Sequence, residues 1–542
     1  MNEHSCREAL YRRRQAPLLV CICLLIAVVS APFIAVSAAE RRQLRLSLRE
    51  ATALALQQNL DIQIAGITPQ IRQAEVTEQR GIFDPVARAE INASHNKLLT
   101  DSSSYRCCPA VDVRESAESG LIGLAAQQDD KQQEVSLGLS QLTPFGGTYD
   151  VEIAGIHLDT NARLLNNFDD FRTTGVEHYT SVVEMTVSQP LLKGFGKTVT
   201  QNDILIAQNN QSISSEDFRS QVIDSTSQVQ QSYWDLVFRR QDLAVRTQQL
   251  ELSEKLLGQV RRQVEVGTLA PIEVLQAETN IATVKQRIII AANAVRNAED
   301  SLKRAMNLSL VGEFANVEIM PTDTPLYRVL DVDQDKEIAA ALENRHDLAQ
   351  ERLTLENQNI SLVFNKNQVL PTLDLEASLG FNGLDETLGS SIDELNTDRH
   401  QWRVGVVFRY PLGNRQAKSR LQQNRLAIRQ QLLQIKNLEE TIMAEVRTAV
   451  RAVQASAELV LASTAASRLS QRQLEAEEKK LSVGLSTVFI VLQFQDDLAV
   501  QRSVEIQSLT EHLKAIIQLE QAKNTLLKTY DIVIQDYRPR LP

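Results

Sequence analysis

The feature that most constrains this chain is a long stretch without helix breakers, and it occurs twice. Residues 198–266 form a run of 69 residues with no proline and one glycine, and residues 415–483 form a second run of 69 with neither. A continuous helix of that length reaches roughly 100 Å. Such a helix is stable only if it packs against other elements along its length. We therefore predict an elongated, mainly helical protein.

The second run also carries a coiled-coil pattern. Two apolar stripes follow the heptad spacing: Leu421, Ile428, Ile435 and Ile442, and Leu432, Val446, Val453 and Val460. Apolar residues at this spacing form a seam between packed helices. The other faces are rich in Gln, Arg, Glu and Ser, which suits contact with water.

Each run ends at the same short motif. Val266-Gly267 and Val483-Gly484 are each followed, a few residues later, by Val-Leu-Gln at 274–276 and 491–493. A glycine just past a helix end takes the left-handed conformation without strain, and Pro271 suits the first turn of a returning helix. We predict a helical hairpin at each motif.

The chain is an internal duplication. Residues 54–62 match 341–348, residues 185–197 match 406–418, and Gly267 matches Gly484. The offsets of 286, 221 and 217 place about 65 extra residues in the first copy, between Pro85 and Pro190. Each copy is predicted to run helix, strands, long helix, turn, helix.

The predicted strands are short and alternate in polarity. Residues 373–381 and 402–410 place apolar side chains on one face and charged or small ones on the other, and residues near 87–93 and 179–188 do likewise. Strands of nine to eleven residues with an oily and a polar face are typical of transmembrane β-barrels. Half-buried strands of a soluble sheet are the alternative. The aromatic residues expected to face lipid are Tyr179, Phe381, Trp402, Phe408 and Tyr410.

Two strands per copy give four core strands per chain, which is too few for a barrel. Open sheet edges are not tolerated in lipid, so a membrane barrel requires several subunits. Three copies supply twelve core strands. The segments 134–142 and 148–156, around a turn at 143–147, form a plausible extra hairpin. It either widens the barrel to eighteen strands or lies outside it.

Residues 1–38 are predicted to be a cleaved signal peptide. Arg12, Arg13 and Arg14 precede an uncharged apolar stretch that ends in small residues before Ala38. An uncleaved membrane anchor is the alternative, since the 23 uncharged residues from Ala16 can just span a bilayer. Only Cys107 and Cys108 remain after cleavage, which excludes a disulfide framework and a four-cysteine zinc site.

Charge and motifs argue against nucleic-acid binding and catalysis. The formal net charge is -11, and nearer -13 without the signal peptide, so no nucleic-acid partner is expected. The sequence has no nucleophile elbow, phosphate-binding glycine loop or H-E-x-x-H motif. His346 and His512 are interpreted as surface residues of helices. We expect no cofactor, no metal and no enzymatic activity.

The combination of motifs resembles the TolC-type outer-membrane efflux proteins. It consists of the signal peptide, the duplication, Q-P-L-L-K-G-F-G at 189–196 and V-G-x-x-x-x-x-x-V-L-Q at both hairpins. The resemblance covers essentially the whole mature chain. It implies a mainly α fold with a membrane β-barrel shared by a homotrimer, continued by a trimeric α-barrel.

The resemblance also implies a role. The barrel lies in the lipid of the outer membrane of a Gram-negative bacterium, and the helical tunnel extends into the periplasm. The trimer is a passive exit duct that works with a periplasmic adaptor protein and an inner-membrane pump, in tripartite efflux or type I secretion.

On this basis the chain divides into nine segments. They are the signal peptide (1–38), a first-repeat N-terminal helix (39–82), first-repeat strands with an extracellular loop (83–190), a first-repeat helical hairpin (191–308), an equatorial linker (309–337), a second-repeat helix (338–370), a second-repeat β-hairpin (371–411), a second-repeat helical hairpin (412–530) and a C-terminal tail (531–542).

The resemblance assigns roles to three groups of residues. The periplasmic tips that contact the adaptor are Val266, Gly267, Thr268, Leu269, Val483, Gly484, Leu485 and Ser486. The strand-to-helix junctions are Pro190, Gly194, Gly196, Pro411 and Gly413. The candidates for the constriction of the tunnel are Glu273, Ile490, Gln493, Asp496 and Asp497.

The constriction departs from the family pattern. The acidic ring expected in the second repeat falls on Ile490 and Gln493, which cannot carry a negative charge. Glu273 keeps an acid in the first repeat, and Asp496 and Asp497 lie a turn further along. Each of these acids has a simpler interpretation as a solvated charge on a helix face.

Two other functions fit the same patterns. One is an elongated coiled-coil structural protein of the cell envelope, whose strands form a soluble domain. The other is a sensor held in the inner membrane by an uncleaved N-terminus. Heat-modifiable trimers in outer-membrane fractions and ion conductance distinguish the duct from the coiled-coil protein. The sensor predicts that Met1 is kept in the mature protein.

Overall fold

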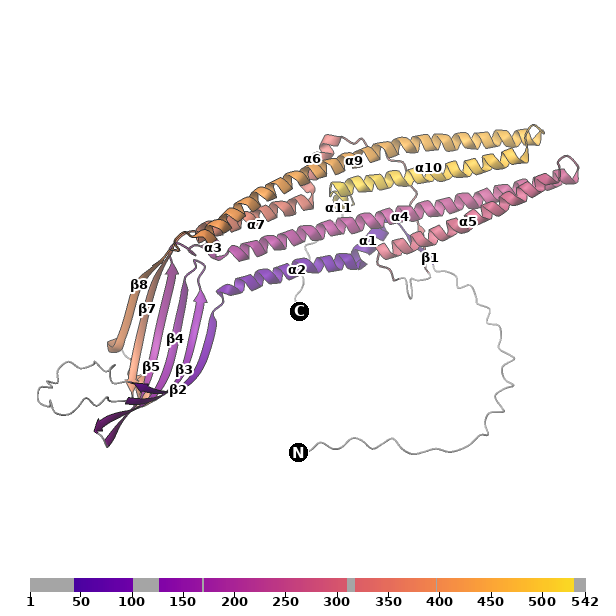
Figure 1. Cartoon of the computed structure of the whole chain (residues 1–542). Helices are drawn as coiled ribbons and strands as arrows, with labels where there is room; N and C mark the ends of the chain where they lie inside the picture. The colour runs from indigo at the N-terminus through magenta and orange to yellow at the C-terminus, as the bar shows by residue number, and fades with distance from the viewer. Residues whose placement is uncertain (1–42, 101–125, 168–169, 310–316, 396, 531–542) are drawn as a thin grey trace, which may run out of the picture.

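The computed structural model describes residues 43–100, 126–167, 170–309, 317–395 and 397–530. The predicted signal peptide, Cys107, Cys108 and the tail at 531–542 lie outside these residues. The described chain is a long curved rod, with helices along most of its length and a β-sheet at one end (Figure 1). We call the end of the sheet farthest from the helices its distal end.

Two helical hairpins form the body of the rod. α4 (Asn202–Glu265) has 64 residues and turns back into α5 (Ile272–Ala305), and α9 (Arg415–Ser482) has 68 residues and turns back into α10 (Val488–Ala522). They lie side by side in the order α5, α4, α10, α9 (Figure 1). The predicted heptad stripes of α9 are only partly buried. Val446, Val453 and Val460 are buried, whereas Leu432 is exposed, because α9 is an outermost helix of the subunit.

A second set of helices completes the half of the rod nearest the sheet. α1 (Leu48–Gln58) and α2 (Leu60–Arg80) belong to the first repeat, and α6 (Gln334–Asn344) and α7 (His346–Gln368) to the second. The break between the two helices has the same backbone geometry in both copies, with φ and ψ of −64° and 122° at Asn59 and −66° and 121° at Arg345. Here α2, α4, α7 and α9 pack in that order.

A small parallel sheet ties the two repeats together at mid-length. β1 (Gln43–Leu46) pairs with β6 (Glu318–Pro321), which lies in the linker between α5 and α6. The buried hydroxyl of Tyr233 on α4 donates to Oδ2 of Asp323 at 2.8 Å and accepts from the Asp323 amide at 3.2 Å. Oδ2 of Asp323 in turn accepts from the Leu48 amide at 2.6 Å. The N-terminal strand, the linker and α4 therefore share one polar anchor.

The large sheet has six antiparallel strands. They are β2 (Val86–Thr100), β3 (Ala126–Leu142), β4 (Thr148–Asn167), β5 (Asp170–Pro190), β7 (Thr372–Asp385) and β8 (His400–Arg409), in that spatial order. The extra hairpin, β3 and β4, lies inside the sheet between β2 and β5. The sheet of the described chain thus has six strands, the four predicted core strands and the two of the extra hairpin.

Short elements complete the described fold. α3 (Lys197–Thr200) precedes α4, α8 (Leu388–Asp393) lies between β7 and β8, and α11 (Leu526–Thr529) follows α10. Two 3₁₀ turns span Gly81–Phe83 and Thr397–Arg399. Among the described residues, every helix is too short or too polar to cross a bilayer.

Candidate membrane sheet, junction and helix tips

The register of the six strands gathers apolar side chains on one face. Leu137, Ile153 and Val183 lie opposite one another on β3, β4 and β5, and the row continues on β7. This apolar face contains Ala87, Ala89, Ile91, Val135, Leu137, Leu139, Val151, Ile153, Val183, Met185, Val187, Leu375, Ala377, Leu379, Phe381, Trp402, Val404, Val406 and Phe408. Many of these side chains are exposed in the single subunit, Ile91 by 80% and Trp402 by 70%.

The predicted lipid-facing aromatics fall on or beside this face. Phe381, Trp402 and Phe408 belong to it by register, and Tyr179 lies on the same side nearer the distal end. Tyr179 stacks on His157, with ring centroids 4.4 Å apart. Tyr410 directly follows β8 and is exposed.

The opposite face is polar and charged. Arg88, Glu152 and Glu184 lie in one row across β2, β4 and β5. Nη2 of Arg88 lies 3.5 Å from Oε2 of Glu152, and Arg409 and Asp374 form an ion pair of 3.2 Å on the same face. A sheet that is oily on one side and ionic on the other suits lipid against one face and water against the other.

The apolar face becomes ionic towards the distal end. Beyond Ile91 and Val135 the same face carries cations and carboxylates, with Lys97 3.3 Å from Asp129 and Lys131 3.2 Å from Asp159. The apolar band therefore has a sharp distal boundary, and β3, β4 and β5 extend past it.

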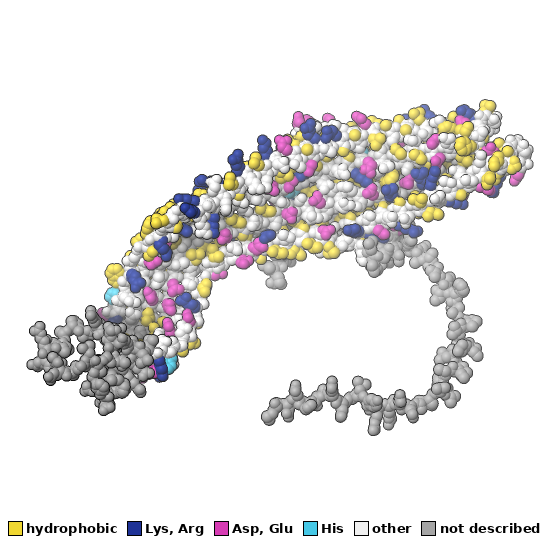
Figure 2. Space-filling model, in the orientation of Figure 1, with side chains coloured by type: hydrophobic (Ala, Val, Ile, Leu, Met, Phe, Trp, Pro, Cys, Tyr) yellow, Lys and Arg dark blue, Asp and Glu magenta, His cyan; other side chains and the backbone are white. Residues whose placement is uncertain are grey.

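The two edges of the subunit are distinct. β2 and α2 form one edge, and β8 and α9 form the other. The edge helices expose apolar side chains: Leu60, Ile64, Ile67 and Ile71 on α2, Ile289 and Ile290 on α5, and Leu426 and Leu433 on α9. Figure 2 shows hydrophobic side chains scattered over the surface of the helical part.

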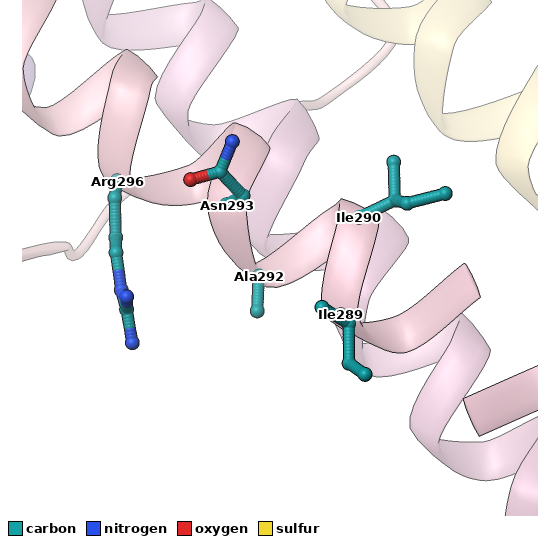
Figure 3. Close-up of a pocket in the computed structure, with 5 residues that line it drawn as sticks. All are labelled: Ile289, Ile290, Ala292, Asn293 and Arg296. Carbon is teal, nitrogen blue, oxygen red and sulfur yellow. The ribbon is translucent and has the colours of Figure 1, made fainter. Parts of the chain in front are cut away.

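A shallow hollow lies on the exposed surface of α5. It is lined by Ile289, Ile290, Ala292, Asn293 and Arg296, all from α5. In Figure 3, Ile289, Ala292 and Arg296 project from the same side of this helix. A hollow formed by one helix alone is a surface that a second helix can fill.

The junctions between strands and helices use left-handed glycines. Gly194, Gly196 and Gly413 have φ of 87°, 109° and 89°. Asn367 at the end of α7 holds the first junction, because its Oδ1 accepts from the Gly194 amide at 2.7 Å and its Nδ2 donates to the Leu192 carbonyl at 2.9 Å.

The turn of the extra hairpin packs against the same junction. The Gly196 amide donates to the Phe145 carbonyl at 3.2 Å. A Cβ on Gly146 would lie 2.3 Å from the Gly194 carbonyl oxygen, so only glycine fits there. Pro190 and Pro411 end β5 and follow β8, where each chain leaves the sheet.

The two predicted tips have the same helix cap. Gly267 and Gly484 both have φ of 79°. In the first copy the amides of Gly267 and Thr268 donate to carbonyl oxygens of the last turn of α4, at 3.0 Å and 2.8 Å. In the second copy the amides of Gly484 and Leu485 donate in the same way to the last turn of α9, at 3.1 Å and 2.9 Å. These paired bonds define a Schellman motif.

The side chains of the tip residues make different contacts in the two copies. Ser486 donates to Glu477 at 2.6 Å, and Lys480 lies 2.9 Å from the same carboxylate. These hydrogen bonds lower the pKa of Glu477. Val266, Val483 and Leu485 are exposed, whereas Leu269 packs against the apolar cluster just inside the tip.

The constriction candidates do not form one cluster. Asp496 is bonded within the subunit, since Arg287 on α5 and Gln249 on α4 both donate to its Oδ1. Gln493 and Asp497 are exposed on α10, and Ile490 is half-buried. Glu273 is half-buried at the start of α5.

The expectation of two surface histidines is wrong. His512 is fully buried, with Ser456 at 2.9 Å from Nδ1 and the Arg328 carbonyl at 2.9 Å from Nε2. His346 is mostly buried and lies 2.6 Å from Glu216. Both histidines join helices or linker within the fold. Among the described residues, no cluster of His, Cys, Asp or Glu has the composition of a metal site.

The family follows from a sequence profile. The profile described as outer membrane efflux protein matches residues 123–308 and 338–525, one match in each repeat, on either side of the linker. The chain is an outer membrane efflux protein. Membership of this family confirms the resemblance, the outer-membrane location and the transport role predicted above.

Solved structures support the fold of this outer membrane efflux protein. The CmeC outer membrane channel of Campylobacter jejuni has a TM-score of 0.60 at 14% identity, over 88% of this chain and 86% of that one. VceC of Vibrio cholerae has a TM-score of 0.60 at 13% identity, over 88% of this chain and 96% of that one. The open state of the MtrE channel of Neisseria gonorrhoeae has a TM-score of 0.58 at 14% identity, over 88% of this chain and 89% of that one. Among curated proteins, none has a significantly similar sequence.

Proposed function

We propose that three copies of this chain form a passive exit duct, with a barrel of eighteen strands in the outer membrane and a tube of helices in the periplasm. The observation that carries this proposal is the pair of open edges on a sheet with one oily face. In lipid, each backbone amide and carbonyl must be hydrogen-bonded within the protein, so β2 and β8 need partners.

The directions of the edge strands fit closure by identical neighbours. β2 runs from α2 towards the distal end, and β8 runs back towards α9. β8 of one subunit and β2 of the next therefore meet antiparallel, like every other pair in the sheet. Such a head-to-tail contact closes into a ring if the rotation fits. The exposed apolar side chains of α2, α5 and α9 then pack between subunits along the tube.

The inserted hairpin brings the barrel to about the width of the tube. Near the sheet each subunit supplies four helices, α2, α4, α7 and α9, but six strands. Packed helices lie about 8–10 Å apart, whereas strands lie about 4.8 Å apart and tilt by about 40° in a barrel. Twelve helices and eighteen strands therefore both give a circumference of about 100–120 Å, so the duct keeps its width where it enters the membrane.

The tips carry the contact with partners and the gate. Val266, Gly267, Thr268 and Leu269, with Val483, Gly484, Leu485 and Ser486, form the periplasmic end that meets the adaptor, which in turn engages an inner-membrane pump or a type I secretion system. Gln493 and Asp497 lie on one exposed stripe of α10 with Phe489 and Val500, and we assign this stripe to the narrow part of the tunnel. Asp496 instead restrains the hairpins.

The experiment is fractionation and conductance of the mature protein. We expect heat-modifiable trimers in the outer membrane and ion-conducting pores in planar bilayers. A soluble elongated protein without conductance overturns the proposal and supports the structural coiled-coil alternative.

Two valines of β8 provide a matched pair. Val404 lies on the apolar face and Val407 on the polar face. Val404→Arg is expected to cost about 2–4 kcal/mol of membrane insertion, whereas Val407→Arg faces water and leaves assembly intact. Equal effects of the two substitutions contradict the assignment of the faces.

A further inference from the structure

The short helix α8 lies on the apolar face of the sheet. Oγ of Ser391 on α8 is 2.7 Å from Oγ of Ser181 on β5. Ser181 pairs with Gly383 of β7, and both belong by register to the same face as Val183 and Phe381. A Cβ on Gly383 would lie 1.8 Å from the Ser391 carbonyl oxygen, so the backbone of α8 rests directly on this glycine.

Small residues create the room for this helix. Gly155 of β4 pairs with Ser181, which continues the row across three strands. A Cβ on Gly155 would lie 3.4 Å from Cδ1 of Leu388. Ser181 and Ser391 are buried by the contact. The helix is therefore seated on the strands and does not project from the sheet as a free loop.

The sheet covers the apolar side chains of α8 only in part. Leu388 is 46% exposed and Ile392 is 52% exposed. α8 packs on β5 and β7, and Leu388 reaches Gly155 of β4, so the helix lies away from the β2 edge. The row of strand residues beneath α8 lies at the distal boundary of the apolar band. Phe381 and Val183 lie two residues nearer the helices, and the ionic side chains Asp159 and Glu177 lie on the other side of the row.

We infer that α8 is an interfacial helix whose Leu388 and Ile392 side chains enter the outer leaflet of the membrane. The occupant of this surface is lipid, because the exposed side chains continue the apolar band at its distal boundary. Helices that lie in the interface place apolar residues in the acyl region and polar residues towards water. Here the sheet supplies the attachment, and α8 sets the depth of the barrel. The inference rests on the proposed function, since it takes the apolar face to be in lipid.

The test uses the trimer of the mature chain, without residues 1–38, reconstituted in phosphatidylcholine vesicles. In a Cys107→Ser, Cys108→Ser background, single cysteines at Leu388→Cys or Ile392→Cys carry an environment-sensitive fluorophore. Glu386→Cys is the control in the same loop, because Glu386 is exposed and polar. Val404→Cys is the reference for the lipid-facing sheet. Lipid with a spin label near the headgroup end of its acyl chain is the quencher.

Quenching at 388 and 392 is expected to exceed that at 386 by about twofold or more. If the probe at 404 is quenched and those at 388 and 392 behave like 386, the inference is wrong and the proposed function stands. If the probe at 404 is also unquenched, the sheet is not in lipid and both fail.

A second variant tests the seating of the helix. Gly383→Ala forces the Ser391 carbonyl away, and quenching at 388 should fall while quenching at 404 is unchanged. Unaltered quenching at 388 in Gly383→Ala overturns the contact on which the inference depends. Gly405→Ala on β8 is the matched control, since a Cβ there meets nothing within 4 Å.

Discussion

Arg287 on α5 and Asp496 on α10 are hydrogen-bonded across the two helical hairpins of one subunit. Gln249 on α4 donates to the same carboxylate oxygen at 3.0 Å. Asp496 therefore links the first-repeat hairpin to the second-repeat hairpin a few turns from the tips. Hairpins that separate during opening must break these bonds.

Asp496→Ala is expected to ease the separation of the hairpins. Both charged groups are about a third exposed, at 39% and 35%, so the pair contributes only about 0.2–1 kcal/mol. We expect a modest rise in the open fraction in planar-bilayer recordings. Glu254→Ala is the control, because its ion pair with Lys285 lies within the first hairpin and does not join the two. Equal effects of the two substitutions contradict the linking role.

Tyr233→Phe should weaken the anchor at mid-length. The hydroxyl is buried and bonds Asp323 in both directions, so its loss removes two hydrogen bonds from the anchor. The expected cost is about 1–3 kcal/mol of stability. Thermal unfolding of the purified protein measures it, with Tyr410→Phe as the exposed control. An unchanged melting temperature in Tyr233→Phe argues against the anchor.

Glu520 and Lys523 should shape the pH dependence of stability. Burial raises the pKa of Glu520, but hydrogen bonds from Lys523, Thr525 and Thr529 outweigh it and set the pKa below the ordinary 4.5. Burial lowers the pKa of Lys523, but Glu337 and Glu520 outweigh it and set the pKa above 10.5.

The sign of each contribution follows from linkage. A lowered carboxylate pKa stabilises the fold above pH 4.5, and this stabilisation is lost as the pH falls through the folded-state value. A raised lysine pKa stabilises it below pH 10.5, and this is lost as the pH rises through the folded-state value. Glu520→Gln should therefore flatten the acid limb of a plot of melting temperature against pH. An unchanged acid limb contradicts the assignment.

Gly267→Ala and Gly484→Ala should each destabilise a tip. Both glycines are left-handed, and an L side chain in that conformation costs about 1–2 kcal/mol. Hydrogen exchange of the amides at 484 and 485 should accelerate in Gly484→Ala. Gly258→Ala, inside α4 with open space around it, should instead stabilise by about 0.5–1 kcal/mol. Similar exchange in wild type and Gly484→Ala contradicts the capping role.

Deletion of residues 126–169 should narrow the pore. β2 and β5 run in opposite directions, so they can pair once β3 and β4 are removed. Twelve strands in place of eighteen reduce the cross-section of the barrel, so neutral polymers added from the distal side should be excluded at a smaller size. A trimer of the deletion variant with an unchanged polymer cut-off shows that the hairpin does not line the barrel.

The long helices and their tips were predictable because their causes are local. The absence of proline and glycine over 198–266 and 415–483 left no signal to stop a helix, and one glycine at each end permits the cap. α4 ends at Glu265 and α9 at Ser482, each within two residues of the glycine. The alternating strands were visible for the same reason, since side chains on a strand alternate between faces whatever the strand pairs with.

The sequence by itself therefore determined the lengths of the helices, the turns between them and the polarity of each strand face. Only the tertiary structure decided that β3 and β4 enter the sheet, that α8 rests on Gly383, that His512 is buried, and that Asp496 bonds Arg287. These four facts depend on strand register or on contacts between residues far apart in the sequence, such as 209 residues for Arg287 and Asp496 and 210 residues for Ser181 and Ser391. Local propensity carries no information about either.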